Sequence, residues 1–441
     1  MNREDRERLA RRQRMLAREQ GRTSGPVPGT SGSIGLQTPR RVQRGRPAAP
    51  AAPEPENPHL RPLAPIKRRR QKRRMLVLAA LVLLLALGFA LLSGAFSGSL
   101  ALLGDAMDTF TIYASREGGS WPANTGIEVP KQIEPLAGGF VELDAEDVVV
   151  YSSYGGRLRA VQPGYARPVI TTGNARFLVY NRGGAELRVE SRTRTLYTAS
   201  FENPLLLASV SNNGTVAAVT SSARYAAELY VYDPGFRELL TWQMTGAEGT
   251  PIALAFSTDN RRLAVGTLAA RSGQMASTVT LLDLRGEDQP VYTATTGSTL
   301  LRLQWMGRDR LLAVFDNYLT LLDTARMTET ARYDIGGGTL QSVSVSGRQT
   351  ALLLNVRGTN TLVTLDESLT PLAEIPAGQA TAITAAQTGV YLVCADRVQF
   401  YGYDGVQRWE HLCDTTPQAV LNTGSNVLLF TGTTARVLTG P

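Results

Sequence analysis

Residues with the chemistry of a catalytic or metal site are few in this chain, and they are scattered. Two histidines occur, His59 in a proline-rich stretch and His411 in a strand-like run over residues 409–412. Zinc and iron sites typically need several histidines, or a histidine with carboxylates. A Ser-His-Asp triad would need an exposed nucleophile, and no Gly-x-Ser-x-Gly turn is present to supply one. We therefore assign no catalytic, cofactor-binding or metal-binding residue and expect no cofactor.

Cys394 and Cys413 are the only cysteines of the chain. If this region lies outside the membrane, a disulfide would persist there, and closing a loop of about 20 residues would contribute about 3 kcal/mol of stability. In a meander of strands, however, the two residues end strands that have another strand between them, which is too far for a direct bond. A disulfide formed through the connecting loops and two separate thiols both stay open, and the strand spacing favours the thiols.

Aspartates recur at the ends of short apolar strands, spaced 38–50 residues apart. They are Asp233, Asp283, Asp323, Asp366 and Asp404. An Asp side chain in this place accepts hydrogen bonds from the backbone about two residues on and so starts a turn. A calcium-binding ring is the alternative, but no Asp-x-Asp-x-Asp-Gly loop is present to complete the coordination. We interpret these aspartates as turn residues.

The most distinctive loop of the chain is formed by Asn181, Arg182, Gly183 and Gly184. These residue types, between two runs of alternating character, are typical of a hairpin turn. As an alternative, Arg182 could present its guanidinium to a carboxylate ligand at the mouth of the fold. The hairpin explains the loop without any ligand, and we favour it.

From about residue 130 onward, the sequence reads as an all-β domain. Short β-branched and aromatic runs alternate with Gly, Asn and Asp, without a sustained 3.6-residue pattern. A unit of about 40 residues with about four strands recurs, which is typical of a β-propeller. Candidate first strands begin near Ile133, Pro168, Leu205, Pro251, Leu300, Leu340, Ala380 and Ala419. We expect eight blades, with seven as the alternative if the first or last unit is miscounted.

The last of these units contains only three strands. A propeller removes its open edges when a strand from the other end of the chain completes the terminal blade. Residues 109–127 are placed to supply that strand. We therefore expect a linker with a closing strand over residues 98–129 and the propeller over residues 130–441.

Positive charge is concentrated in a tail over residues 1–74. The tail carries 20 of the 46 Lys and Arg residues and 6 of the 38 Asp and Glu residues, which leaves 26 basic and 32 acidic residues beyond it. It contains no aromatic residue, and ten of the 23 prolines lie between residues 23 and 66. We expect it to be mostly disordered, with a short helix over residues 2–22. Because the rest is mildly acidic, we expect no nucleic-acid partner.

A single transmembrane helix is predicted over residues 75–97. Residues 75–96 are apolar and uncharged, and as a helix they would extend about 33 Å, enough for a hydrocarbon core of about 30 Å. The basic cluster before it comprises Lys67, Arg68, Arg69, Arg70, Lys72, Arg73 and Arg74. Such a cluster stays in the cytoplasm, so the propeller is expected outside, with membrane lipid contacting the helix and its basic flank. A cleaved signal peptide is the main alternative, and the long charged prefix argues against it.

Two stretches resemble the blades of quinoprotein-dehydrogenase-like propellers in the spacing of Asp, Gly and Trp. They are residues 233–242 (DPGFRELLTW) and 404–409 (DGVQRW). In those propellers the Trp docks between neighbouring blades. The resemblance therefore implies architecture and no quinone.

Three further runs occur in order behind the basic tail and the apolar helix. They are residues 177–184 (FLVYNRGG), 209–220 (SVSNNGTVAAVT) and 254–268 (LAFSTDNRRLAVGTL). With them, residues 100–440 resemble an uncharacterised family of single-pass, membrane-anchored, WD40-like propellers found mainly in Gram-positive clostridia. The resemblance implies a cell-surface location and a propeller, and it supplies no catalytic residue.

Three functions are compatible with these features. The first, which we favour, is a non-enzymatic scaffold or sensor that binds an extracytoplasmic protein or a cell-wall glycan through loops on a rigid disc. The second is an extracytoplasmic enzyme of quinoprotein or hydrolase type, and the third is a sensor that signals through the basic tail. Three or more carboxylates or arginines around a pocket at the mouth of the central channel would favour the enzyme, whereas a channel lined by small apolar and hydroxyl residues would rule the enzyme out.

Overall fold

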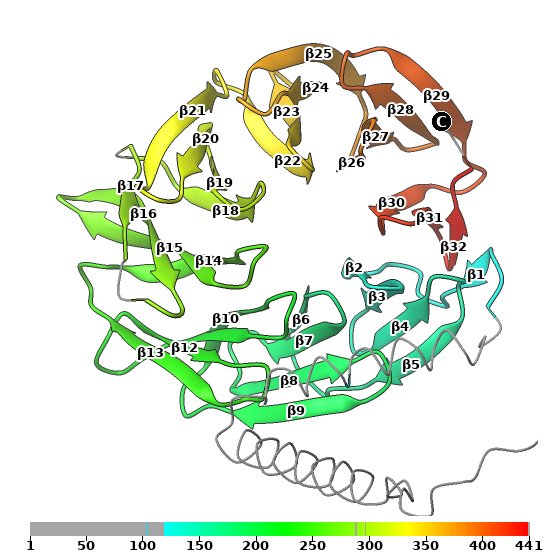
Figure 1. The fold of residues 1–441 in the computed structure, drawn as a ribbon. Helices are drawn as coiled ribbons and strands as arrows, with labels where there is room; N and C mark the ends of the chain where they lie inside the picture. The colour runs from blue at the N-terminus through cyan, green and yellow to red at the C-terminus, as the bar shows by residue number, and fades with distance from the viewer. Residues whose placement is uncertain (1–103, 105–118, 287–288, 296, 440–441) are drawn as a thin grey trace, which may run out of the picture. The chain divides into compact units, whose positions relative to one another are not determined.

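The computed structural model describes residue 104 and residues 119–286, 289–295 and 297–439. These residues form 32 strands in eight four-stranded sheets (Figure 1). The predicted tail over residues 1–74, its short helix over residues 2–22 and the predicted transmembrane helix over residues 75–97 lie outside the described residues. Within the part that is described, no helix combines the length and the hydropathy needed to cross a bilayer.

Each sheet is an antiparallel meander, and we number the sheets as blades 1 to 8 in chain order. Blade 1 contains β2 (Gln132–Leu136), β3 (Gly139–Leu143), β4 (Val148–Ser152) and β5 (Arg157–Val161), and blade 2 contains β6 (Pro168–Thr172), β7 (Arg176–Asn181), β8 (Glu186–Ser191) and β9 (Thr195–Ser200). Blade 3 contains β10 (Leu205–Val210), β11 (Val216–Thr220), β12 (Ala227–Tyr232) and β13 (Glu238–Met244), and blade 4 contains β14 (Thr250–Phe256), β15 (Arg262–Arg271), β16 (Gln274–Asp283) and β17 (Val291–Thr293).

The remaining strands follow the same order. Blade 5 contains β18 (Leu300–Trp305), β19 (Arg310–Phe315), β20 (Tyr318–Asp323) and β21 (Thr328–Asp334), and blade 6 contains β22 (Thr339–Ser346), β23 (Gln349–Val356), β24 (Thr359–Leu365) and β25 (Pro371–Gly378). Blade 7 contains β26 (Ala382–Ala385), β27 (Gly389–Val393), β28 (Arg397–Gly402) and β29 (Gln407–Leu412), and blade 8 contains β30 (Pro417–Asn422), β31 (Val427–Thr431), β32 (Thr434–Val437) and β1 (Ala123–Asn124).

The blades close into a ring with the first strand of each blade on the inside (Figure 1). First strands of neighbouring blades contact each other, as β2 does with β6 and β10 with β14, and β30 of blade 8 returns to contact β2 of blade 1. All eight first strands begin within two residues of the positions predicted from the sequence. The predicted eight-bladed propeller is therefore confirmed, and the seven-bladed alternative is wrong.

The ring is closed by β1, which comes from the opposite end of the chain to the other three strands of blade 8. In the pairing of β1 with β32, Ala123 lies opposite Ala435. Just beyond β1, the backbone N–H and the hydroxyl of Thr125 both donate to the carbonyl oxygen of Thr433, at 2.8 Å and 3.1 Å. The strand lies within residues 109–127, the stretch from which the sequence predicted it.

Hydrophobic packing between blades explains why the middle strands are apolar on both faces. Every residue of β11 is buried, whereas most residues of the outermost strand β13 are exposed or half-buried. Val219 of blade 3 packs in one cluster with Leu263 of blade 4, and Trp242 packs against it. Trp409 packs against the cluster shared by blades 7 and 8. The predicted docking of these tryptophans between blades is confirmed.

The recurring aspartates start turns, as the sequence predicted. The side chain of each accepts a hydrogen bond from a backbone N–H two residues on, over 2.8–3.1 Å; these are Asp233, Asp283, Asp323, Asp366 and Asp404. The carboxylate of Asp366 accepts a second one from Thr370 at 2.8 Å. These contacts fix the turn between the third and fourth strands of a blade.

The seam between blades 8 and 1, where the ring closes, is built from aromatic side chains. Phe140 stacks on Tyr151 with ring centroids 4.8 Å apart, and it meets Phe430 of blade 8 edge-on at 5.3 Å. The hydroxyl of Tyr151 donates to the carbonyl oxygen of Thr125 at 3.1 Å. The seam is thus held by packing of large rings as well as by the short strand pairing.

A carboxyl group is buried beside this seam. Glu142 is 1% exposed, and in its sheet it lies opposite Ile133 and Val149, which both pack in the hydrophobic cluster of the seam. Its Oε2 atom has no hydrogen-bond partner among the described residues. Burial, together with the nearby negative charge of Asp144, raises the pKa of Glu142 to about 7.

Glu142 should therefore make the stability of the propeller depend on pH. The pKa of Glu142 is about 7 in the folded chain and about 4.5 in the unfolded chain, so the folded chain holds the proton more tightly. This contribution to the free energy of unfolding is fully present below pH 4.5 and is lost as the pH rises to 7. Glu142→Gln should thus raise the unfolding free energy by up to about 3 kcal/mol at about pH 8 and leave it nearly unchanged at about pH 4. Thermal unfolding of the full chain at both pH values measures this, and an equal effect at the two would contradict the buried acid.

Candidate functional site

The innermost strands that are described contain few ionisable residues. Across the eight first strands that are described, the charged residues are one carboxylate, Glu134 of β2, and one arginine, Arg302 of β18. Small apolar or hydroxyl side chains occupy many of the other positions, and examples are Thr171, Ser209, Ala253, Ser342, Ser344 and Thr384. The innermost strands by themselves therefore supply fewer than three charged groups.

The two charged groups of the innermost strands influence each other. Burial raises the pKa of Glu134, and the positive charge of Arg302 opposes part of that rise. Burial likewise lowers the pKa of Arg302, and Glu134 opposes that fall. The guanidinium also donates to the carbonyl oxygen of Val343 in blade 6 at 3.2 Å. The pair therefore balances its own charge and holds an inner strand of blade 5 against blade 6.

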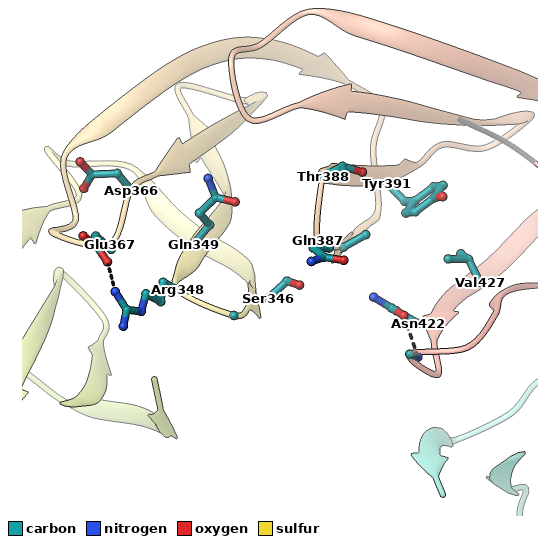
Figure 2. Close-up of a pocket in the computed structure, with 13 residues that line it drawn as sticks. Ser346, Arg348, Gln349, Asp366, Glu367, Gln387, Thr388, Tyr391, Asn422 and Val427 are labelled. Carbon is teal, nitrogen blue, oxygen red and sulfur yellow. Dashed lines mark hydrogen bonds and ion pairs between the residues drawn. The ribbon is translucent and has the colours of Figure 1, made fainter. Parts of the chain in front are cut away.

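A cavity of about 840 Å³ is lined by three consecutive blades (Figure 2). We call it the blade 6–8 cavity. Blade 6 contributes Ser346, Gly347, Arg348, Gln349, Asp366 and Glu367, blade 7 contributes Ala386, Gln387, Thr388 and Tyr391, and blade 8 contributes Asn422, Gly424 and Val427. Most of these residues lie in or next to turns that join first to second strands or third to fourth strands. In antiparallel blades these turns share one face, which we call the cavity face.

The charged residues at the cavity are engaged in ion pairs or in fixing a turn. Glu367 accepts hydrogen bonds from Arg348 at 2.8 Å and from Arg310 at 3.3 Å, and these contacts lower the pKa of its carboxyl group. Asp366 uses one carboxyl oxygen to fix its turn. The two arginines and two carboxylates together carry no net charge.

Uncharged polar side chains form another part of the cavity wall, beside Ala386, Tyr391 and Val427. The side chains of Gln349, Gln387 and Thr388 make no hydrogen bond to another residue in the described part of the chain, so their donors and acceptors are available. Figure 2 shows Gln349 on the blade 6 side of the cavity and Gln387 and Thr388 on the blade 7 side. Asn422 accepts the backbone N–H of Gly424 at 2.9 Å and so holds the turn of blade 8.

Two glycines keep the turns at the cavity tight and open. Gly347 and Gly424 have φ of 61° and 83°, a conformation that side chains of L-residues rarely adopt. A Cβ atom at either position would meet no other atom within 4 Å. The space in front of both turns is therefore open to a ligand.

The predicted loop from Asn181 to Gly184 lies on the opposite face from this cavity, because it joins the second and third strands of blade 2. The N–H of Gly184 donates to the carbonyl oxygen of Asn181 at 2.9 Å, and Gly183 has a φ of 80°. The hairpin interpretation of this loop agrees with these contacts. Arg182 is exposed, and the alternative that it binds a carboxylate ligand stays a prediction.

Cys413 and His411 lie near Arg436 of blade 8, whereas Cys394 packs against the cluster between blades 6 and 7. Both cysteines are free thiols, and β28 separates the strands that Cys394 and Cys413 follow, so the disulfide alternative is not formed. Burial raises the pKa of both thiols. His411 stacks on Trp409, and its Nε2 atom lies 2.8 Å from Arg436. No group of three or more metal-ligating side chains gathers among the described residues, and the predicted basic cluster over residues 67–74 lies outside them.

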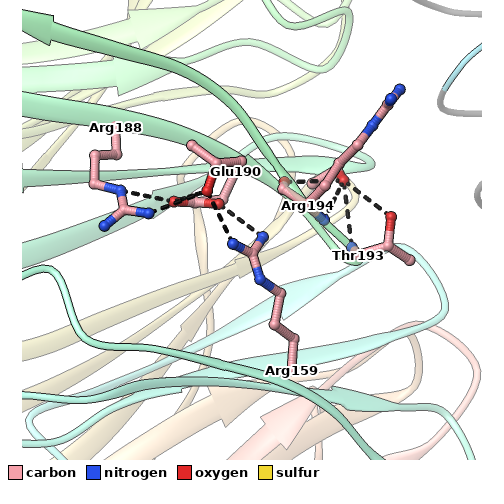
Figure 3. A network of polar contacts seen from close by, with 7 residues as sticks. Arg159, Arg188, Glu190, Thr193 and Arg194 are labelled. Atoms are coloured by element: carbon pink, nitrogen blue, oxygen red, sulfur yellow. Dashed lines mark hydrogen bonds and ion pairs between the residues drawn. The ribbon is translucent and has the colours of Figure 1, made fainter.

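A second polar cluster has a structural role between blades 1 and 2 (Figure 3). Glu190 is completely buried and forms ion pairs with Arg159 at 2.8 Å and with Arg188 at 2.9 Å. The hydroxyl of Thr195 donates to the same carboxylate at 3.2 Å and accepts a hydrogen bond from Arg159 at 2.9 Å. The carboxylate is thus fully used in joining the two blades.

Sequence reasoning missed the cavity. Its wall comes from three repeat units that are far apart in the sequence. Glutamines such as Gln349 and Gln387 are common in exposed turns, so nothing distinguished them. The glycines of its turns, Gly347 and Gly424, did not mark it, because a glycine also occurs in the turn after the first strand of other blades, as at Gly138, Gly214 and Gly307.

Comparisons with known proteins agree with the fold and leave the activity open. Residues 121–438 match the model of a family described as "Family of unknown function (DUF5711)". No protein with a curated function matches the chain.

Solved propeller structures resemble the chain at low identity. The C-terminal WD40 domain of Sif2 is 9% identical, with 74% of this chain and 99% of that chain covered at a TM-score of 0.53. The computationally designed Ika8 protein is 12% identical, with 72% and 98% covered at a TM-score of 0.52. BamB from Moraxella catarrhalis is 13% identical, with 73% and 96% covered at a TM-score of 0.49. At these identities the likeness extends to the fold alone.

The role of Glu190 can be tested by removing its charge. Glu190→Ala would leave Arg159 and Arg188 without their buried counter-charge, so the unfolding free energy should fall by about 3–5 kcal/mol. Glu410→Ala is the matched control, because it removes a surface partner of Arg397 and should leave the unfolding midpoint unchanged. Chemical denaturation of the full chain measures both, and similar midpoints for the two variants would refute a structural role for Glu190.

Proposed function

Because this chain belongs to the DUF5711 family of unknown function, we propose its role from its own geometry: a membrane-anchored, extracytoplasmic propeller that binds a protein or a cell-wall glycan without catalysing a reaction. The observation that carries the proposal is the blade 6–8 cavity. Its wall offers unpaired amide and hydroxyl groups, while its charged groups are engaged in ion pairs or in fixing a turn. Such a wall can recognise a ligand through hydrogen bonds.

Rigidity supports a binding role. The cavity wall comes from three blades, and each blade packs its two faces against its neighbours, as the clusters between blades 6 and 7 and between blades 7 and 8 show. Binding groups held in this way lose little conformational entropy when a ligand arrives. The charged residues that line the cavity, Arg348, Asp366 and Glu367, are engaged in an ion pair or in fixing a turn, which favours binding over the alternative enzyme.

The location of the propeller is part of the proposal. The apolar residues 75–97 would cross the membrane, and the basic residues 67–74 before them would stay in the cytoplasm. About 25 residues then lead to β1, a length of chain that spans at most about 85 Å. The ligands of the cavity would therefore be molecules near the extracytoplasmic face of the membrane, such as cell-wall glycan or a neighbouring protein.

The three lysines of the chain provide a direct test of this topology. Lys67 and Lys72 precede the predicted membrane helix, and Lys131 follows it and is exposed. A membrane-impermeant amine reagent on intact cells should modify Lys131 and spare Lys67 and Lys72, and the same reagent on lysed cells should modify all three. Mass spectrometry of the recovered chain identifies the modified residues. Protection of Lys131 in intact cells would overturn the proposed location.

The anchor itself can be tested by charge. The double change Leu84→Arg and Leu85→Arg puts two charges in the predicted span, where each costs several kcal/mol, and should release the chain from the membrane fraction. Leu16→Arg in the tail is the matched control and should leave the chain in that fraction. Fractionation after cell lysis measures this, and continued membrane retention of the double variant would contradict the proposed anchor.

A further inference from the structure

The blade 6–8 cavity favours one class of ligand over the others. We infer that it binds a neutral saccharide, of the kind that a cell-wall glycan would present. The inference rests on the proposed extracytoplasmic binding role and assigns it a site and a ligand class. Four features of the cavity carry it: its size, the chemistry of its wall, its balance of charge and its open turns.

The size and shape of the cavity suit a small polar molecule. Its volume of about 840 Å³ lies within the range of about 300–1,000 Å³ that is usual for small-molecule sites. A protein partner typically covers about 800 Å² of each surface and inserts exposed aromatic or methionine side chains. The one aromatic residue of this wall, Tyr391, is only 5% exposed.

The wall chemistry matches sugar hydroxyls. An amide side chain offers both donors and an acceptor, and a hydroxyl group does the same, so each can satisfy a sugar hydroxyl in either role. Gln349 on blade 6 and Gln387 and Thr388 on blade 7 provide such groups with no partner among the described residues. Figure 2 shows them on two sides of the cavity, so one ligand can contact both blades.

The charge of the wall argues for a neutral ligand. The positive charges of Arg348 and Arg310 are both directed at Glu367, over 2.8 Å and 3.3 Å. Glu367 offsets the charge of one arginine and the carboxylate of Asp366 offsets the other, so the group has no net charge that would favour an anion or a cation. A neutral saccharide can bind beside these groups without leaving a charge uncompensated.

The open turns allow a ring to approach the backbone closely. Gly347 and Gly424 leave the space in front of their turns empty, so a ligand can approach the peptide groups of blades 6 and 8 without meeting a side chain at either position. The adjacent side chains are fixed by the turns themselves, as Asn422 is by its contact with Gly424.

The test titrates the full chain, purified in detergent, with neutral trisaccharides of glucose, of galactose and of N-acetylglucosamine. At least one should bind with a Kd of about 1 mM or tighter. Gln349→Ala and Gln387→Ala should each weaken binding about fivefold, and the double variant about twentyfold, because each removes a hydrogen bond between neutral groups. Gln379→Ala, in a turn of blade 6 on the opposite face, is the matched control and should bind as the unchanged chain does.

The possible outcomes separate this inference from the proposed function. Absence of binding by all three trisaccharides, or equal binding by the double variant, overturns the saccharide site. Binding of a neutral serine tripeptide with the same dependence on Gln349 and Gln387, and no saccharide binding, assigns the cavity to a peptide instead. Cross-linking on intact cells, with the unchanged chain and the double variant, then tests the wider role. Capture of the same partner by both leaves the proposed binding function standing without this cavity, and capture of none by either refutes that function.

Discussion

Closure of the ring is the constraint on which the rest of this structure depends. Each blade has two apolar faces and is stable only when both are covered, so blade 1 and blade 8 must meet. The strand that completes blade 8 is two residues long, and the aromatic contacts of Phe140, Tyr151 and Phe430 support it. This seam joins the two ends of the propeller, and its burial raises the pKa of Glu142.

Several polar and charged side chains of the described residues hold this ring together. The recurring aspartates fix turns, Glu190 joins blades 1 and 2, and Glu134 and Arg302 balance each other on the inner strands. Gln349, Gln387 and Thr388, which have no such contact, lie at the turns of blades 6 and 7. A rigid frame with free hydrogen-bonding groups at one face is suited to recognition, because little freedom is lost on binding.

The position of the cavity follows from the same geometry. Turns that join first to second strands repeat on one face of the ring, so residues about 40 positions apart, such as Arg348 and Gln387, become neighbours. The repeat supplies the frame, and the differences between repeats supply the site. At this cavity, blades 6 and 8 each combine a glycine with an open turn, and blade 7 between them supplies Gln387 and Thr388.

The sequence alone was sufficient for the architecture, because that depends on local and periodic signals. Runs such as VAAVT in β11 must be buried on both faces, a four-strand repeat of about 40 residues must close, and a last unit of three strands needs a strand from elsewhere. The site depended on the tertiary structure. Gln349, Gln387 and Asn422 are ordinary turn residues until three blades bring them around one cavity, and the spare cysteines are two thiols because β28 lies between their strands. Strand pairing and ring closure decide which residues of different repeats become neighbours, and local sequence patterns do not contain that information.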